Sequence, residues 1–232
     1  MNLLVDEMEI ENRLHYEGRN SMELKKDFDL YEFVGIIIPG FLALFSCSIS
    51  IPEVKNFIWS KDISASLLGI VILLSYPAGQ IVQLLGNILE KIWWKFWKGM
   101  PSNWVIQEKP KLLSKEQIVQ LETKVSSMLG GNRDLSSIPP TEWYPIVRQI
   151  NARVEISGAN KKVETLLGMY GLNRGIAAAM LFHSGLWSMF QGMTDLRYIA
   201  LFVILFVFGL IRMHMFGVNY ARELFVRFIE GG

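Results

Sequence analysis

Polar side chains that interrupt long apolar stretches are the residues of this chain most able to do chemistry. The clearest example is Arg174, which lies within the apolar stretch 166–190. A charged side chain in such surroundings is costly unless it pairs, faces water or extends to an interface, so it commonly marks a site of function. Four further polar residues lie near the matching ends of other apolar stretches. The predicted polar layer comprises Glu32, Gln80, Arg174, Arg212 and His214.

This predicted polar layer supports two interpretations. As a network, it would bind an anionic solute or a lipid head group at the inner mouth of a helix bundle. In the alternative, each residue is an independent residue at a membrane interface, where its polar end reaches water. No nucleophilic side chain stands beside these residues in the sequence, so the layer predicts binding rather than catalysis.

The motifs that usually carry catalysis are missing from the sequence. It contains no GxxxxGK[ST], HExxH, CxxC or GxSxG pattern, so phosphate-loop, zinc-protease, thiol-redox and serine-hydrolase chemistry all lack support. The single cysteine, Cys47, can form no intramolecular disulfide. Lysines of the middle segment are scattered and mixed with glutamates, which argues against a nucleic-acid surface. We expect a non-enzymatic protein with no catalytic residue, no metal ligand, no cofactor and no direct nucleic-acid binding.

The elements that must position these residues are long apolar stretches without Asp or Glu. A membrane span requires roughly 20 mostly apolar residues, and these stretches meet or nearly meet that length. Hydrophobic residues make up 51% of the chain and charged residues 19%, compared with ~25% charged in soluble domains. We predict an all-α integral membrane protein with four transmembrane helices; the alternative is a soluble bundle of unusually apolar helices. The stretches are 33–51, 63–89, 166–190 and 198–221.

The distribution of positive charge predicts the topology. Of the 23 Lys and Arg residues, four precede the first stretch, twelve lie within 90–162 and two follow the last stretch. The positive-inside rule therefore places both termini and the middle segment in the cytoplasm, with the protein in the inner (plasma) membrane. The predicted parts are a cytosolic leader 1–31, a hairpin 32–89, a helical cytosolic insertion 90–165, a second hairpin 166–221 and a cytosolic tail 222–232.

An aromatic and basic segment, residues 91–98, follows the second stretch directly. Its sequence is KIWWKFWK, and tryptophan and lysine both favour the head-group level of a bilayer. We expect this interfacial segment to lie in the inner membrane interface as an aromatic belt; the alternative is a lipid sensor or an amphipathic wedge. Its predicted lipid contacts are Lys91, Trp93, Trp94, Lys95, Trp97 and Lys98.

Small residues form a stripe along the third stretch. Gly171, Gly175 and Ala179 recur every four residues, and such stripes let helix backbones approach closely in membranes. The pattern predicts helix packing, and we expect it to support a homo-oligomer. In the first stretch, Pro39 and Gly40 predict a bend, because proline removes a backbone donor and leaves a carbonyl to be satisfied by a neighbour or by water.

The predicted insertion contains two helices. Ser114 and Gln117 fit a capping box, and the helix that follows should end at Gly130. A second helix begins between residues 141 and 145 and carries an apolar stripe that includes Trp143. No strong breaker separates this helix from the third stretch, so it is expected to run, with a bend at Ser157 and Gly158, into the membrane and to couple the cytosolic part to the bundle.

Two classes of function remain. In the first, the protein is a non-enzymatic membrane module that oligomerises, receives a cytosolic protein or signal and responds in the bilayer by opening a pore or disrupting the membrane. In the second, it is a subunit of a transporter or of a membrane enzyme. The layout over the whole chain resembles that of small multi-pass membrane effectors of bacterial phage-defence systems. That resemblance rests on topology and implies a toxic activity that stays silent until triggered.

Overall fold

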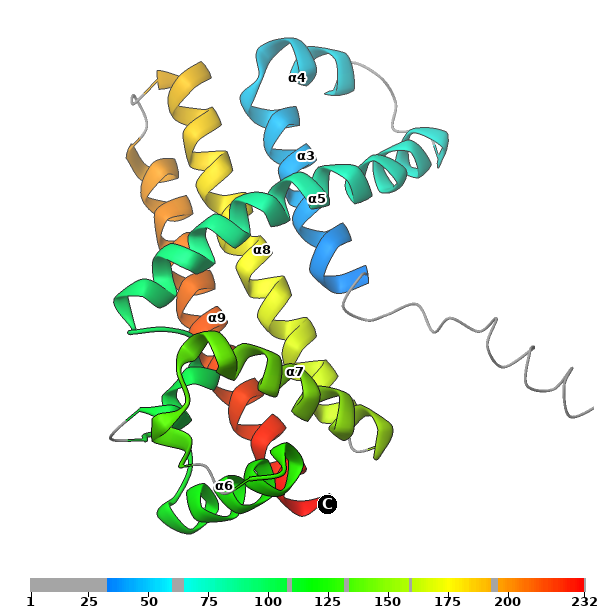
Figure 1. The fold of residues 1–232 in the computed structure, drawn as a ribbon. Coiled ribbons are helices and arrows are strands. Elements are labelled where there is room, and N and C mark those ends of the chain that lie inside the picture. The colour runs from blue at the N-terminus through cyan, green and yellow to red at the C-terminus, as the bar shows by residue number, and fades with distance from the viewer. Residues whose placement is uncertain are drawn as a thin grey trace, which may run out of the picture.

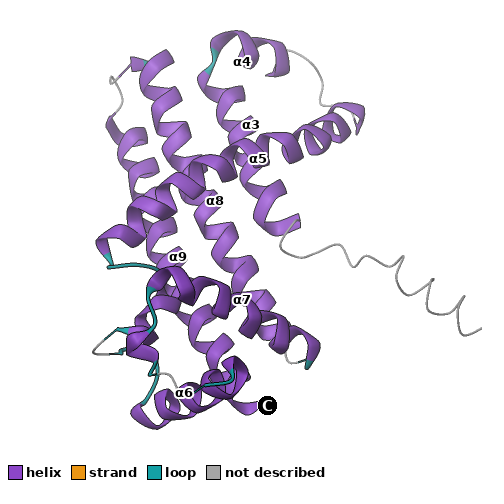
Figure 2. Cartoon of the chain, viewed as in Figure 1, coloured by secondary structure: helices purple, strands orange, loops and turns teal. Residues whose placement is uncertain are grey.

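The protein is helical throughout the part that the structure describes. A computed structural model describes residues 33–59, 65–107, 110–131, 134–158, 160–192 and 196–231, and no strand occurs in these ranges (Figures 1 and 2). The prediction of an all-α chain is therefore confirmed. The elements are η1 (Phe33–Ile37), α3 (Ile38–Ser50), α4 (Pro52–Trp59), α5 (Ala65–Phe96), η2 (Pro101–Ile106), α6 (Lys115–Leu129), η3 (Leu135–Ser137), α7 (Pro140–Ile156), α8 (Lys161–Phe190) and α9 (Leu196–Glu230).

Two of the described helices, α5 and α9, are long and apolar enough to cross a membrane. The sequence predicted four such helices, and the other two fall short for different reasons. The apolar helix at Gly35–Ser50 is too short by itself. Helix α8 has 30 residues, but the polar residues Asn173, Arg174 and His183 lower its hydropathy.

Helices α3, α8 and α9 run side by side, and α5 crosses in front of them at an oblique angle (Figure 1). Together these four helices form the bundle. Helix α8 lies between α3 and α9 and packs on both, while α5 packs on α3 and α8.

Glycines determine how closely the bundle helices approach. A Cβ atom built on Gly40 would lie 1.8 Å from the carbonyl oxygen of Ser75, and one on Gly79 would overlap the carbonyl oxygen of Ile36. Helices α3 and α5 therefore cross with their backbones in contact, which only glycine at these positions allows. Gly209 has the same role where α9 meets Ala177 of α8.

The insertion packs around the last turns of α9. Leu224, Phe225 and Phe228 of α9 are buried together with apolar residues of α6 and α7, including Leu121 and Trp143. We call this cluster, which also contains residues of η2 and η3, the insertion core. Residues 222–230, predicted as part of a cytosolic tail, thus belong to a continuous helix at the centre of a packed unit.

Predictions for the insertion helices have mixed outcomes. The capping box is confirmed, since the Ser114 side chain accepts from the Gln117 backbone and the Gln117 side chain accepts from the Ser114 backbone. The helix ends at Gly130, as predicted, in the left-handed conformation. The expected run of α7 into the third stretch is wrong. Helix α7 ends at Ile156, the chain turns at Gly158 with φ 71°, and α8 begins anew.

Candidate functional site

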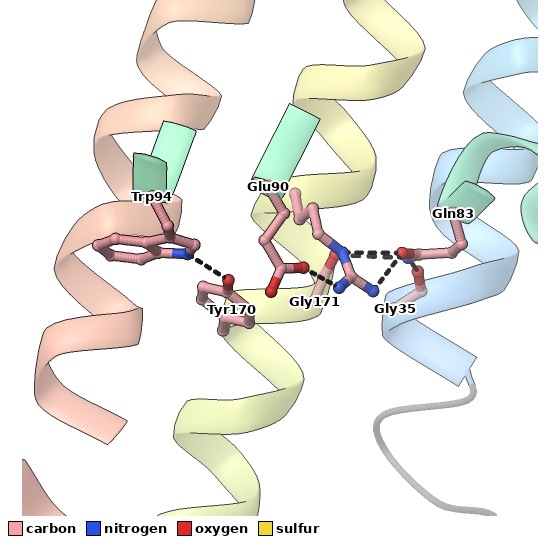
Figure 3. A network of polar contacts seen from close by, with 7 residues as sticks. Gly35, Gln83, Glu90, Trp94, Tyr170 and Gly171 are labelled. Atoms are coloured by element: carbon pink, nitrogen blue, oxygen red, sulfur yellow. Dashed lines mark hydrogen bonds and ion pairs between the residues drawn. The ribbon is translucent and has the colours of Figure 1, made fainter. Parts of the chain in front are cut away.

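A polar network inside the bundle is the candidate functional site. It joins η1, α5 and α8 through the side chains of Gln83, Arg174 and Glu90 (Figure 3). The close crossing of α3 and α5 brings Gln83 inward, where it is only 7% exposed. A buried amide must use both its donor and its acceptor to offset the loss of water.

Gln83 satisfies that requirement completely. Its Nε2 donates to the carbonyl oxygen of Gly35 and, at 3.4 Å, to that of Gly171. The Gly35 carbonyl needs a donor because Pro39, four residues further on, has no N–H. The prediction that a neighbour would satisfy the carbonyl freed by this proline is confirmed. The Oε1 of Gln83 accepts from Nε and Nη2 of Arg174, at 3.2 and 2.7 Å.

Arg174 completes the network with an ion pair to Glu90. Its Nη1 donates to Oε2 of Glu90, and the two side chains are only 12% and 16% exposed. Gly86 makes room for this contact, because a Cβ there would lie 3.2 Å from Cγ of Arg174. The guanidinium also lies 6.0 Å from the ring centre of Tyr170. A charge placed this deep is stabilised only while these partners stay in place.

Trp94 and Tyr170 extend the polar contacts toward α9. The indole Nε1 of Trp94 donates to the Tyr170 hydroxyl at 2.8 Å, and Gly217 leaves space for both rings (Figure 3). Trp94 was predicted to contact lipid at the interface, but it is only 3% exposed. Its indole N–H, which would otherwise favour head groups, finds its partner within the protein.

The rest of the interfacial segment lies at the surface. Lys91, Lys95 and Lys98 are exposed, and Trp97 is 48% exposed. Trp93 is half-buried. Four of the five side chains just named are therefore open to the surroundings of the protein, as a head-group contact requires.

The predicted polar layer divides among different surroundings. Arg174 belongs to the network described above, whereas Gln80 is exposed. The Arg212 guanidinium lies 4.7 Å from the ring centre of Phe216. Glu32 lies outside the described residues.

His214 belongs to an aromatic cluster between the end of α5, η2 and α9. Its Nδ1 accepts from Nε1 of Trp93 at 3.4 Å. The ring centres of Trp97 and Trp94 lie 4.4 and 5.1 Å from the imidazole, and that of Trp104 lies 6.1 Å away. His214 therefore packs with tryptophans and takes no part in the Gln83–Arg174–Glu90 network.

The stripe of small residues on α8 packs against helices of the same chain. A Cβ on Gly175 would lie 2.4 Å from Cγ of Pro39, and the carbonyl of Gly171 accepts from Gln83. Ala179 is fully buried. These three positions thus permit close packing within the bundle, and α3 and α5 occupy the face that was expected to serve a second copy.

Glu90 and the role of Gln83 were missed by the sequence interpretation. Glu90 stands at the boundary between an apolar stretch and a charged one, so it was assigned to the cytosolic insertion. A usable signal existed, because Gln83, Gly86 and Glu90 are spaced by three and four residues and share one face of a helix. Two polar residues around a glycine on one face indicate a site for a long polar side chain of another helix.

The network joins η1, α5 and α8 through paired polar groups. Each charged group in it is paired, and no group of three or more His, Cys, Asp or Glu side chains that could hold a metal ion occurs among the described residues. No family model matches the chain, and neither a curated protein nor a solved structure matches it. The function must therefore be inferred from the geometry of this molecule alone.

Proposed function

We propose that this chain is a non-enzymatic multi-pass membrane protein whose bundle responds to a partner or signal received by the insertion. The observation that carries the proposal is the distribution of polarity. All seven buried polar side chains recorded for the described residues come from the bundle helices: Ser46, Ser48, Ser50, Ser75, Gln83, Asn173 and His183. Large apolar side chains such as Leu73 and Ile204 stand on its outer surface. A bundle with this arrangement suits an apolar solvent.

The soluble alternative predicts the opposite arrangement. A core helix of a soluble protein is mostly buried, whereas only 22% of the most apolar part of Leu68–Ile106 and 17% of that of Leu196–Glu230 is buried. Exposed apolar surface on this scale marks contact with a membrane or a partner. We infer that lipid covers it.

Helices α3 and α8 complete a four-span bundle in this proposal. Elements η1 and α3 together cover Phe33–Ser50, a length of about 27 Å, close to the roughly 30 Å of the hydrocarbon core. The polar residues of α8 do not face lipid, because Asn173 and His183 are buried and Arg174 is paired. The positive charge of the middle segment supports a cytoplasmic position for the insertion and both termini, in the inner membrane.

Helix α9 supplies the coupling between the two parts. It runs unbroken over Leu196–Glu230, with Leu210 and Met213 buried in the bundle and Phe225 and Phe228 buried in the insertion core. A displacement of the insertion therefore moves a helix of the bundle. The sequence suggested that one continuous helix, formed by α7 and α8, would connect the insertion to the bundle. Because the chain breaks between α7 and α8, the continuous helix α9 makes this connection instead.

The response of the bundle follows from the Gln83–Arg174–Glu90 network. The Arg174–Glu90 pair and Gln83 hold α5 and α8 together, and opening this contact would expose a charged path between them. We propose that opening it permeabilises the bilayer, with assembly of several copies, as in the membrane effectors of phage defence that the layout resembles. Such an effector stays inactive while the contacts of the Gln83–Arg174–Glu90 network are intact.

The test is membrane permeability in bacterial cells that express the full chain. A voltage-sensitive dye and a membrane-impermeant DNA stain are read for the wild type, Glu90→Gln and the exchange Glu90→Arg with Arg174→Glu. Glu90→Gln should depolarise cells more than the wild type. The exchange should return the signal toward the wild-type level, because it rebuilds the ion pair but not the hydrogen bonds that Arg174 donates to Gln83. Glu155→Gln, at an exposed site of α7, is the matched control.

Two results would overturn the proposal. Extraction of the wild type from membranes by alkaline carbonate would remove the membrane placement. Equal dye signals for Glu90→Gln and Glu155→Gln, at equal protein levels in the membrane, would remove the effector role and leave an anchor or a transporter subunit.

A further inference from the structure

An open cavity of about 1060 Å³ lies between the end of α5, the η2 segment and α9. We call it the basic aromatic pocket. Its walls include Trp97, Lys98, Trp104, Lys111, His214 and Arg222. The pocket is separate from the Gln83–Arg174–Glu90 network, and its walls come from both the bundle and the insertion.

The charged side chains in the described lining of the pocket are all positive. Lys98, Lys111 and Arg222 come from three segments of the chain, and no acidic side chain is among its described lining residues. Nε of Arg222 donates to the carbonyl oxygen of Leu112 at 3.2 Å, which orients the guanidinium. Three cations around one cavity repel each other unless an anion is present, and phosphate oxygens are a preferred partner of such groups.

The backbone at Lys98 gives an independent indication. Lys98 has φ 59°, in the left-handed region, and occupies the position after helix α5 that glycine usually takes. The same motif closes α6, where Gly130 holds the equivalent position. At α5 the glycine comes one residue later, at Gly99. A lysine in this left-handed conformation, where glycine would be unstrained, points to a function for its charge.

Two contacts hold this strained turn against the pocket. Nε1 of Trp104 donates to the carbonyl of Gly99 at 3.2 Å, and Nε2 of Gln107 donates to that of Lys98 at 3.4 Å. The η2 segment is thereby tied to the end of α5, and the Lys98 side chain starts from a fixed backbone. A preformed arrangement of this kind lowers the entropic cost of binding.

The aromatic side of the pocket provides a surface for an apolar portion of the ligand. Trp97 and Trp104 lie within 4.4 and 6.1 Å of the His214 ring, so three rings stand beside the cations. In the proposed topology this level is the inner membrane interface, where tryptophan and lysine contact lipid head groups.

We propose that the basic aromatic pocket binds a phosphate-bearing group, carried by an anionic phospholipid or by a soluble phosphate ester. The lipid source rests on the membrane placement proposed above; the phosphate chemistry rests on the pocket itself. A ligand held here would touch α5, η2 and α9 at once, so it would bear on the same helix that couples the insertion to the bundle.

The experiment is native mass spectrometry of the full chain in a neutral detergent. The probes are dihexanoyl phosphatidylglycerol, dihexanoyl phosphatidylcholine and glycerol 3-phosphate. The variants are Lys98→Gly, which suits the left-handed backbone while removing the charge, and Arg222→Gln. Lys115→Gln is the matched control, since Lys115 is exposed on α6 and lies outside the pocket lining.

We expect phosphatidylglycerol to bind about tenfold more tightly than phosphatidylcholine, with that preference lost in Lys98→Gly and Arg222→Gln and kept in Lys115→Gln. Binding of glycerol 3-phosphate with the same dependence on the variants would support the site and assign a soluble ligand. Equal losses in all three variants, or no preference in the wild type, would overturn the proposal. Carbonate extraction of the wild type decides the membrane placement separately.

Discussion

The bundle and the insertion core bury opposite kinds of side chain. The insertion core is apolar throughout, from Leu121 and Trp143 to Phe225. The bundle buries serines, amides, a histidine and an ion pair, and exposes leucine, isoleucine and phenylalanine. In water only the first arrangement is driven by the hydrophobic effect. Under the membrane placement proposed above, one chain folds in two solvents, with α9 common to both.

The insertion core and the bundle should therefore lose stability through different kinds of substitution. A cavity should damage the insertion core, because burial of apolar surface stabilises it. Loss of a polar partner should damage the bundle, because its packing and hydrogen bonds act without a hydrophobic drive between helices.

Removal of the buried guanidinium should have the largest effect. Arg174→Ala leaves Glu90 without its ion-pair partner and the Oε1 of Gln83 without its two donors, at a cost of about 3–5 kcal/mol to the folded bundle. Lys98→Ala removes an exposed charge and should cost less than about 1 kcal/mol. Unfolding of the purified protein in mixed micelles with increasing dodecyl sulfate measures both. Equal effects would show that Arg174 acts as an independent interfacial residue.

Two phenylalanines of α9 should distinguish the two solvents. Phe225→Ala opens a cavity against Trp143 in the insertion core and should cost roughly 3 kcal/mol. Phe208 is 58% exposed on the bundle, so Phe208→Ala should change stability by less than about 0.5 kcal/mol. The same micelle titration, followed by tryptophan fluorescence, reports both changes. A large loss for Phe208→Ala would reveal a protein partner where lipid is proposed.

Two glycines of α8 test the packing of the bundle. Gly175→Leu drives a side chain into Pro39 and should cost about 1–3 kcal/mol by separating α8 from α3. Gly185 has open space around it, so Gly185→Leu should be tolerated. Thermal unfolding in detergent, with oligomer size on a native gel, measures the pair. An altered oligomer with unchanged thermal stability would instead assign Gly175 to an interface between copies.

The sequence predicted local features of single segments well, and it predicted poorly how the helices cross one another. The capping box at Ser114 and the freed carbonyl near Pro39 depend on residues a few positions apart, so chain-local rules were sufficient. The ion pair of Arg174 with Glu90 depends on the angle at which α5 crosses its neighbours, and that angle follows from the backbone contact of Gly40 with α5. A pattern along one helix does not contain that information, and for the same reason the burial of Trp94 could not be predicted.

The smallest expected effect is the loss in acid of the stability contributed by Glu223, which pairs with Lys162 and Arg227. Burial alone would raise the pKa of Glu223, but hydrogen bonds from Lys162 and Arg227, together with their charges, lower it below its ordinary value. These contacts are 2.8 and 2.9 Å long and lie beyond the proposed span of α9. Because the folded pKa is the lower one, the contribution is complete above the unfolded value of about 4.3 and is lost as the pH falls through the folded value.

Glu223→Gln should remove this contribution, which we expect to be less than about 1 kcal/mol because Lys162 is largely exposed. The measurement is thermal unfolding between pH 7 and pH 3 for the wild type and the variant. The two curves should differ most near neutral pH and converge in acid, where the wild-type carboxyl is also neutral. A difference that persisted below the folded pKa would show that Glu223 acts through packing of its side chain rather than through its charge.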